Sequence, residues 1–448
     1  MDFPRIVISA TSSGSGKTLI TCGLLKALKN RSKNVTAFKC GPDYIDPMFH
    51  QKVLKTPSRN LDTYFTDAQT TRYLFTNVAT NFDISIIEGV MGYYDGLGGV
   101  SDKASAYDLA KTLEAPVILV INAKGMSLSI AAVIKGFIEF RDDSNVQGII
   151  LNQASEMIYP ELKKVIEKEL NIKVLGYVPK SDDLVIESRH LGLVIPDEIT
   201  EIENKIDSLA KILEKTLDID EIINIANAAN PLNQEECILP KLNKNVTIAI
   251  ARDEAFCFYY EDNIELMKKM GAKIVEFSPI HEKRLPPNID VLLLGGGYPE
   301  LYAAKLSENK SMLCDMKEYV KNDKPILAEC GGFMYLHDTM EDINGLAYQM
   351  VGAVKGHVFK TDKLGRFGYI ELTPKDESEV TSLEQRIKGH EFHYWDSTNC
   401  GESYLAKKPL RNKEWNCIHG GEHKCMGFPH LYYYSNPRFI YQFLCKCK

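Results

Sequence analysis

The sequence contains no long hydrophobic run. No apolar stretch in its 448 residues approaches the roughly 20 residues that a helix needs to cross a bilayer. The first residues, MDFPRIVISATSSGSGKT, lack the basic and apolar regions of a secretory signal and the composition of a transit peptide. These absences argue against a membrane-spanning protein, and we expect a cytoplasmic location.

An excess of positive charge and a regular cysteine spacing are also missing. The formal net charge of -7 argues against a nucleic-acid or anionic-membrane surface, although an acidic total is compatible with a local basic cleft. The 11 cysteines follow no regular pairing distance, so we expect reduced thiols. Repeats and low-complexity tracts are absent, which excludes solenoids. With 44% hydrophobic and 25% charged residues, the composition is that of a globular protein of two or three domains.

Short β-rich apolar segments alternate with helix-length segments along the first part of the chain. The segments RIVISA, NVTAFK, ISIIEGV, PVILVINA, VQGIILNQ and IKVLGYVP are each typical of a buried strand. Their alternation predicts an α/β fold with a mostly parallel sheet flanked by helices, over residues 1–197. A charged helical segment and an Asn- and Pro-containing linker should cover 198–245. The alternation restarts at VTIAIA, which predicts a second α/β domain with a mostly parallel sheet over 246–448.

The first predicted strand leads into a phosphate-binding loop. The segment ATSSGSGKT ends at Thr18, and a helix-forming run follows it directly. Gly14 and Gly16 let backbone N–H groups curl around phosphate oxygens. Lys17 supplies a cation to the transferred phosphate, and the Thr18 hydroxyl can ligate Mg²⁺. The loop is one residue longer than G-x-x-x-x-G-K-T, and in this it resembles dethiobiotin-synthetase-like proteins. A plain glycine-rich turn is the alternative, and the preceding strand argues against it.

Four carboxylates follow two of the predicted strands. Asp43 and Asp46 occur in KCGPDYIDPMFH, and Glu88 and Asp95 occur in IIEGVMGYYDG. Loops at the carboxyl ends of parallel strands form the ligand crevice of such sheets, so these side chains can converge on a nucleotide and an acceptor. A turn-forming or solvated role is the alternative for any one of them. We assign Glu88, together with Thr18, to Mg²⁺, and the three aspartates to the acceptor and to phosphoryl transfer.

A second chemical motif lies in the C-terminal half. Cys330 stands in PILAECGGFMYL, between a predicted strand and a predicted helix. This arrangement is typical of a nucleophile elbow, in which a sharp turn exposes the sulfur. The helix N-terminus and a nearby imidazolium are expected to favour the thiolate, which is the form that attacks a carboxamide. Backbone N–H groups of Gly331 and of the GGG loop that contains Gly296 can hold the oxyanion.

The base that partners Cys330 should be a histidine distant in sequence. The candidates are His430 in GFPHLYYYSNP and the pair His390 and His393 in GHEFHYW. We favour His430, because class I glutaminases carry this base near the C-terminus in an H-x-E motif. Tyr432 stands at the third position here, so the orienting Glu is missing and we predict a Cys-His dyad. His390 and His393 are expected to shape the domain interface or the acceptor pocket.

One further cluster could be drawn as a zinc site. It consists of Cys417, His419, His423 and Cys425. Their spacing matches no standard zinc module, and two glycines stand between the inner pair. We therefore predict a hairpin turn at this place.

The motifs occur in the order found in a known family. The segments KCGPDYIDPMFH, RNLDTYF, EGVMGYYDG, APVILVINAKGMSLSIAA, GIILNQ, LGYVP and RHLGL resemble successive blocks of the cobyrinic acid a,c-diamide synthase family. In the second half the resemblance continues through ARDEAFCFYYEDN, GAKIVEFSPI, LGGGYPELYAAKL, AECGGFMYL, GHEFHYW and HLYYYSNP. It covers most of the chain, and Ala10, Cys257 and Tyr432 depart from the family's pattern.

The resemblance implies a ligase that uses ATP and glutamine. A carboxylate would be activated by phosphorylation and then captured by ammonia released at Cys330. The implied acceptor is cobyrinic acid, amidated at its a and c side chains. Arg189, His190 and Arg252 are candidate cations for its carboxylates. The implied partners are small molecules (a polycarboxylate tetrapyrrole, ATP and glutamine) and neither nucleic acid nor a membrane, and a homodimer is left open.

Three other assignments compete with this one. A nickel-sirohydrochlorin a,c-diamide synthase would use the same chemistry on another ring. A cobyric acid synthase would share both domain types but should lack the KCGPDYIDP block. A partition-type ATPase would share the phosphate loop, and the pairing of Cys330 with His430 argues against it.

Overall fold

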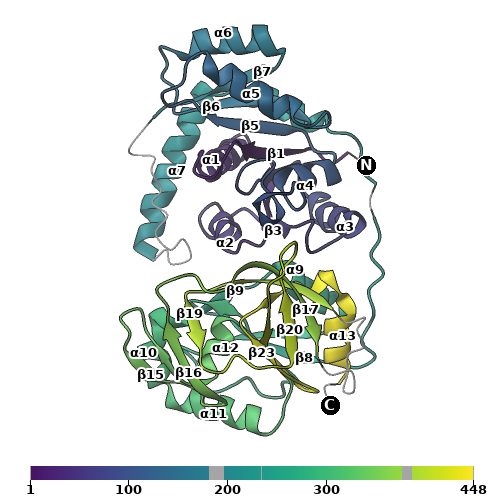
Figure 1. The fold of residues 1–448 in the computed structure, drawn as a ribbon, viewed down its shortest axis with the longest axis vertical. Coiled ribbons are helices and arrows are strands. Elements are labelled where there is room, and N and C mark those ends of the chain that lie inside the picture. The colour runs from purple at the N-terminus through teal and green to yellow at the C-terminus, as the bar shows by residue number, and fades with distance from the viewer. Residues whose placement is uncertain (1, 181–195, 234, 376–385, 447–448) are drawn as a thin grey trace. The chain divides into compact units, whose positions relative to one another are not determined.

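The computed structural model describes residues 2–180, 196–233, 235–375 and 386–446. The chain divides into two compact units, residues 1–237 and residues 238–448, which we call the first and the second unit. Figure 1 shows that both units are built from helices and strands, as expected from the sequence. The α/β fold class is therefore confirmed for each of them.

The first unit is built on a seven-stranded sheet in which all neighbouring strands are parallel, in the order β3-β2-β4-β1-β5-β6-β7. All its strands except β3 coincide with segments predicted from the sequence; β3 is a short, polar edge strand. The strands are β1 (Arg5–Ala10), β2 (Val35–Cys40), β3 (Ser58–Leu61), β4 (Ile84–Glu88), β5 (Val117–Asn122), β6 (Val146–Asn152) and β7 (Lys173–Val178). The helices are α1 (Lys17–Asn30), α2 (Ile45–Lys52), α3 (Ala68–Ala79), η1 (Leu97–Gly99), α4 (Ala106–Thr112), α5 (Ser129–Glu139), α6 (Tyr159–Leu170), α7 (Pro196–Thr216) and α8 (Ile219–Asn227).

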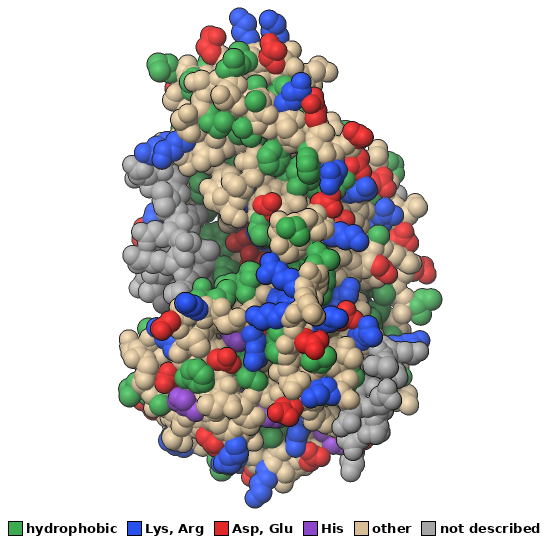
Figure 2. Space-filling model, viewed as in Figure 1, with side chains coloured by type: hydrophobic (Ala, Val, Ile, Leu, Met, Phe, Trp, Pro, Cys, Tyr) green, Lys and Arg blue, Asp and Glu red, His purple; other side chains and the backbone are tan. Residues whose placement is uncertain are grey.

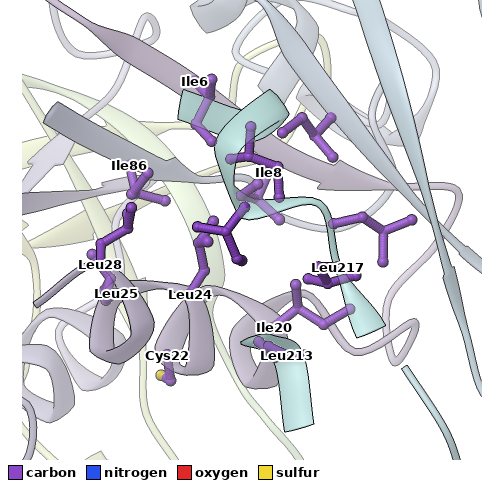
Figure 3. Close-up of a cluster of buried hydrophobic side chains, with 14 of the residues drawn as sticks. Ile6, Ile8, Ile20, Cys22, Leu24, Leu25, Leu28, Ile86, Leu213 and Leu217 are labelled. Carbon is purple, nitrogen blue, oxygen red and sulfur yellow. The ribbon is translucent and has the colours of Figure 1, made fainter. Parts of the chain in front are cut away.

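The core of the first unit fixes the helix that follows the phosphate loop. Helix α1 buries an apolar face against the sheet and against α7, and Figure 3 shows several of the side chains involved. Gly23 permits this close approach, because a Cβ there would lie 2.6 Å from Leu213 Cδ1. Each buried Leu or Ile of this cluster contributes roughly 1.5–3 kcal/mol relative to exposure. Helices α7 and α8 thus pack within the first unit.

The second unit contains a six-stranded sheet in the order β10-β8-β11-β13-β23-β22. Its neighbouring strands are parallel except for the β22–β23 pair. The strands are β8 (Thr247–Ala251), β10 (Lys273–Phe277), β11 (Val291–Leu294), β13 (Ile326–Glu329), β22 (His419–Gly421) and β23 (Lys424–Gly427). The helices of this unit are α9 (Glu261–Met270), η3 (Pro299–Tyr302), α10 (Ala303–Glu308), α11 (Lys310–Lys321), α12 (Gly331–Tyr335), η5 (Tyr433–Ser435) and α13 (Pro437–Cys445).

Further small sheets, which the sequence analysis did not anticipate, lie in the second unit. Most of their strands pair antiparallel, and they are short and mixed in polarity, so they carry no strong sequence pattern. One sheet joins β9 (Phe256–Phe258) to β12 (Gly296–Gly297). Another contains β14 (His337–Glu341), β15 (Ala347–Gln349), β16 (Val354–Lys360) and β19 (Trp395–Ser397). The last contains β17 (Phe367–Pro374), β18 (Ile387–Phe392), β20 (Tyr404–Lys407), β21 (Glu414–Cys417) and β24 (His430–Leu431).

The surface carries charges of both signs. Figure 2 shows Lys and Arg side chains interspersed with Asp and Glu side chains on the face that it displays. Among the described residues, no helix is both long enough and apolar enough to span a membrane.

Candidate active sites

The phosphate-binding loop connects β1, in the middle of the first sheet, to α1. Gly14 and Gly16 have φ angles of 75° and 93°, in the left-handed region that favours glycine. The Lys17 Nζ donates to the backbone oxygen of Ser12 at 3.0 Å and to that of Met91. The ammonium therefore lies across the loop, where it is held by neutral oxygens that an anionic phosphate can replace.

Asn152 supports the loop from β6, two strands away from β1 in the sheet, and was not among the predicted site residues. It ends β6, and its Nδ2 donates to the backbone oxygen of Ser15 at 2.8 Å. A Cβ on Gly16 would lie 2.3 Å from the same nitrogen. Gly16 is thus required by this close approach as well as by its φ angle. The position of Asn152 near the end of the predicted strand VQGIILNQ was the only signal.

Thr18 and Glu88 meet at the carboxyl end of β4. The Thr18 Oγ1 donates to Glu88 Oε1 at 2.5 Å, and Lys39 Nζ donates to the same oxygen at 2.8 Å. His50 Nε2 lies 3.4 Å from Glu88 Oε2. Burial acts to raise the pKa of Glu88, but Lys39 and then His50 outweigh it and hold that pKa below its usual range. The carboxylate is therefore ionised, and with the Thr18 hydroxyl it offers oxygen ligands of the kind that Mg²⁺ prefers.

Lys39 links Glu88 to a second buried carboxyl. It lies in β2, and its Nζ also donates to Asp46 Oδ2 in α2. Burial and then the charge of Glu88 raise the pKa of Asp46 well above its usual range. The Lys39 ammonium thus contacts both carboxyls, and burial beside Glu88 makes Asp46 the less acidic of the two. Burial and then the charge of Lys39 lower the pKa of Lys17 to about 8. Neither Lys39 nor His50 was among the predicted site residues, although Lys39 directly precedes CGPDYIDP.

Asp43 and Asp95 lie in different surroundings from this cluster. Asp43 Oδ1 accepts from the backbone N–H groups of Ile45 and Asp46, at 2.7 and 3.1 Å, so Asp43 caps the start of α2. Asp95 is exposed, and its Oδ2 accepts from the Gly92 N–H at 2.9 Å. The charge of Asp95 acts on Lys17. The structure therefore brings Thr18, Glu88 and Asp46 together and sets Asp95 near the lysine of the loop.

Cys330 occupies a sharp turn between β13 and α12. Its φ and ψ angles are 48° and −105°, a strained backbone for a residue with a Cβ. Its N–H donates to the backbone oxygen of Gly427 at 2.8 Å. This contact ties the turn to β23, a few residues before His430. The geometry is that of a nucleophile elbow.

The glycine loop after β11 lies beside both the elbow and the imidazole. A Cβ on Gly331 would lie 3.2 Å from the Gly297 nitrogen. A Cβ on Gly296 would lie 2.4 Å from His430 Cε1. The loop therefore lies against Gly331 through Gly297 and against the predicted base through Gly296, and any larger residue at position 296 would displace the imidazole.

The charge state of Cys330 and His430 differs from the sequence-based expectation. Burial raises the pKa of the Cys330 thiol. Burial, followed by the neighbouring His390 and His393, lowers the pKa of His430 well below its usual range. Desolvation disfavours both charged forms, so the resting side chains are a thiol and a neutral imidazole rather than a thiolate and an imidazolium. The neutral imidazole is the form that can accept a proton.

Glu329 ties the strand of His430 to the residue before the nucleophile. Its Oε2 accepts from the Leu431 N–H at 3.3 Å, and its Oε1 accepts from Tyr433 Oη at 3.0 Å. Burial raises the pKa of Glu329 to about 8. The carboxyl therefore keeps its proton near neutral pH and links β13 to β24. Sequence reasoning missed this residue, although it stands directly before Cys330.

We expect Glu329→Gln to weaken the pH dependence of stability. The pKa of Glu329 is about 8 in the folded protein against an ordinary 4.5. Between these two pKa values the folded state binds more protons than the unfolded state. The free energy of unfolding therefore falls as pH rises, by at most about 1.4 kcal/mol per pH unit. Glutamine keeps the neutral form and removes this contribution.

Urea unfolding at several pH values between 5 and 8 measures the slope for Glu329→Gln. Both tryptophans, Trp395 and Trp415, belong to the second unit, so their fluorescence reports its unfolding. Glu318→Gln, an exposed change in α11, is the control and should keep the wild-type slope. A wild-type slope in Glu329→Gln would contradict the assignment.

His390 and His393 are both buried in the second unit. His390 faces His430 across the β18–β24 pair, and their rings are stacked with centroids 4.9 Å apart. His393 Nε2 lies 2.9 Å from Glu391 Oε2, and its ring stacks on Phe428 with centroids 4.1 Å apart. Their expected role at a domain interface or acceptor pocket stays a prediction.

Of the three candidate cations for the acceptor, the structure describes only Arg252. Arg252 lies 3.0 Å from Glu261 and 3.1 Å from Glu276, so its charge is compensated within the second unit. Arg189 and His190 lie outside the described residues.

Three residues of the cluster drawn as a zinc site, His419, His423 and Cys425, lie in a β-hairpin, and Cys417 ends the preceding strand β21. Strands β22 and β23 pair antiparallel, with Gly420 opposite Cys425. The predicted hairpin turn is therefore confirmed.

Comparisons with known proteins identify the family to which the two domains belong. A model of the CobQ/CobB/MinD/ParA nucleotide binding domain matches residues 6–194, and one of the CobB/CobQ-like glutamine amidotransferase domain matches residues 247–423. Cobyrinate a,c-diamide synthase of Caldanaerobacter subterraneus is 40% identical, over 98% of this chain and 98% of the relative. The proteins of that name from Clostridium acetobutylicum and Clostridium tetani are 40% and 41% identical, over 97% of this chain and 98% of each relative. Among solved structures, chloroplast FtsY from Physcomitrella patens is 14% identical over 45% of this chain and 64% of that chain, with a TM-score of 0.31, a likeness too weak to carry an argument. The chain, with its nucleotide-binding and glutamine amidotransferase domains, belongs to the cobyrinate a,c-diamide synthase family.

Proposed function

We propose that the protein amidates the a and c side-chain carboxylates of cobyrinic acid, with ATP as the phosphoryl donor and glutamine as the nitrogen donor. The observation that carries the proposal is the similarity to cobyrinate a,c-diamide synthases over nearly the whole chain. Within that length, one chain holds both a phosphate loop and a cysteine elbow. We place the reaction in the cytoplasm, and a homodimer stays a prediction.

In the first unit, the proposed reaction activates a carboxylate. An oxygen of the acceptor carboxylate attacks the γ-phosphorus of ATP, the bond to the bridging oxygen breaks, and ADP leaves. Lys17 and the N–H groups of the loop stabilise the charge on the transferred group. Asp95, exposed near Lys17, and Asp46, which is bonded to Lys39, help to place the acceptor, while Asp43 fixes the start of the helix that bears Asp46.

The residues present also fit a magnesium ion. Among the described residues, no cluster of three or more His, Cys, Asp or Glu side chains forms a complete metal cage. A nucleotide-bound Mg²⁺ does not need one, because phosphates and waters complete its coordination. Thr18 and Glu88 would hold the ion. When bound, Mg²⁺ supplies positive charge to the phosphate oxygens.

In the second unit, the proposed reaction releases ammonia. The Cys330 sulfur attacks the carboxamide carbon of glutamine while His430 accepts the thiol proton. N–H groups at Gly296 and Gly331 hold the oxyanion, and the proton passes from His430 to the departing ammonia. Water then hydrolyses the thioester to glutamate. The ammonia attacks the acyl phosphate, phosphate leaves, and a primary amide results.

We expect Glu88→Gln to leave the fold intact and to raise the Mg²⁺ concentration needed for half-maximal ATP turnover by roughly tenfold or more. An amide oxygen can still accept from Thr18, but it lacks the charge that holds a divalent cation. Titration of ATP turnover with MgCl₂ measures the change. Glu139→Gln, at an exposed position of α5, is the matched control. An unchanged titration curve in Glu88→Gln would show that Glu88 does not bind Mg²⁺ and has a structural role only.

A product assay tests the proposed acceptor. Cobyrinic acid and nickel-sirohydrochlorin are offered separately with ATP, Mg²⁺ and glutamine, and the amides are identified by mass spectrometry. We expect the a,c-diamide of cobyrinic acid. Amidation of nickel-sirohydrochlorin but not of cobyrinic acid would instead identify the protein as a nickel-sirohydrochlorin a,c-diamide synthase. ATP hydrolysis without any amide would favour the partition-type ATPase.

A further inference from the structure

We propose that His390 is a positioning residue for His430, and that it holds the imidazole of the base where an orienting glutamate is missing. The inference rests on the proposed glutaminase activity of the second unit. It concerns a residue for which the sequence suggested only a pocket or interface role, and it goes beyond the pairing of Cys330 with His430.

The contact between the two imidazoles is set by the backbone. His390 in β18 and His430 in β24 are directly opposite each other in an antiparallel pair, so their side chains point to the same face of the sheet. The ring planes are inclined by only 15°, and the centroids are 4.9 Å apart. Gly389 makes the close pairing possible, because a Cβ there would lie 2.4 Å from the His430 backbone oxygen.

His390 is itself fixed by a hydrogen bond. Its Nδ1 lies 3.1 Å from the hydroxyl of Tyr260, which is at the start of α9. The ring of Tyr260 also meets the ring of Tyr432 edge to face, with centroids 5.0 Å apart. Tyr432 occupies the position of the glutamate in the H-x-E motif. The chain Tyr260–His390–His430 therefore runs from a helix to the base through side chains that are all buried.

The stacked arrangement limits the rotation of the His430 ring. His390 lies against the ring, and Gly296 is so close that a Cβ there would lie 2.4 Å from the His430 Cε1. Rotation about the side-chain bonds of His430 would require one of these neighbours to move, and packed interiors resist such shifts. Burial lowers the pKa of His390 to about 3, so its ring is uncharged near neutral pH. A neutral aromatic ring can thus restrain the base without a carboxylate.

The test is a double-mutant cycle. His390→Ala, His390→Phe and Tyr260→Phe are each made alone and combined with His430→Ala, and kcat and KM for glutamine hydrolysis are measured. We expect His390→Ala to lower kcat by about 10²-fold with KM nearly unchanged, because a misplaced base loses its alignment with the thiol. His390→Phe keeps a flat ring against His430, and Tyr260→Phe removes only the hydrogen bond to His390. Each of these variants should therefore lower kcat by about tenfold or less. In the His430→Ala background all three changes should have no further effect.

Two controls separate positioning from folding. His357→Phe removes a half-buried histidine of the same unit that also contacts a hydroxyl, that of Thr339 at 2.7 Å. It should leave kcat near the wild-type value. Amidation with ammonium chloride as nitrogen source and tryptophan fluorescence show whether each variant keeps its fold, and Tyr260→Phe provides a mild variant if His390→Ala does not fold.

Three results would overturn the inference. Equal losses with and without His430 would show that His390 acts independently of the base. A higher KM with unchanged kcat would place His390 in glutamine binding. A large loss in His390→Ala together with a nearly active His430→Ala would make His390 the base. Glutaminase activity absent from the wild-type protein, by contrast, would refute the proposed function itself.

Discussion

Cys330→Ser is expected to abolish glutamine-dependent amidation, with a loss of at least about 10³-fold. The serine hydroxyl is a much weaker nucleophile than sulfur near neutral pH. Burial leaves Cys330 as a thiol and His430 as a neutral imidazole, so attack requires His430 to take the proton of the side chain at position 330. A serine hydroxyl gives up its proton less readily than a thiol, because an alkoxide is the stronger base. The same variant should still form the diamide from high ammonium salt at mildly alkaline pH, because free ammonia can reach the acyl phosphate from solvent.

The yield of diamide from glutamine is compared with the yield from ammonium for wild type, Cys330→Ser and His430→Ala. His430→Ala should lose the same activity but keep more residual hydrolysis than Cys330→Ser, since a thiol ionises more readily than a hydroxyl. Cys314→Ser changes an exposed thiol of α11 and should behave as wild type. Full glutamine-dependent activity in Cys330→Ser would remove the glutaminase assignment from the elbow.

Lys17→Ala is expected to abolish amide formation from either nitrogen source, with a loss of about 10³-fold or more. The ammonium that lies across the phosphate loop would be missing, and Lys39 cannot replace it because it is bound to Glu88 and Asp46. Hydrolysis of glutamine should survive at least in part, because Cys330 and His430 belong to the other unit.

Both activities are measured on one preparation of Lys17→Ala. Lys26→Ala provides the control. Lys26 lies in α1, as Lys17 does, and its side chain forms an ion pair with Asp207 at 2.8 Å. This variant should leave amidation unchanged. Amidation at the wild-type rate with ammonia and ATP would refute the assignment of the phosphate loop.

The strands of the first sheet and the two reactive motifs could be predicted because their signals are local in sequence. The segments RIVISA, ISIIEGV and PVILVINA form the central strands β1, β4 and β5 as expected. Buried parallel strands produce continuous apolar runs, and a phosphate loop or an elbow is a short string of residue types. The polar edge strand β3 and the small sheets of the second unit could not be predicted, since no such pattern marks them.

The sequence by itself determined the fold class, the order of the two chemistries along the chain, and the identities of Lys17, Thr18, Glu88, Cys330 and His430 as candidates. Only the tertiary structure decided what surrounds them. Lys39 and His50 reach Glu88 from other elements, and His390 reaches His430 through a strand pairing across 40 positions of sequence numbering. The structure also decided that Cys330 and His430 rest uncharged. Burial and the contacts between distant residues set these properties, and neither is encoded in the spacing of residues along the chain.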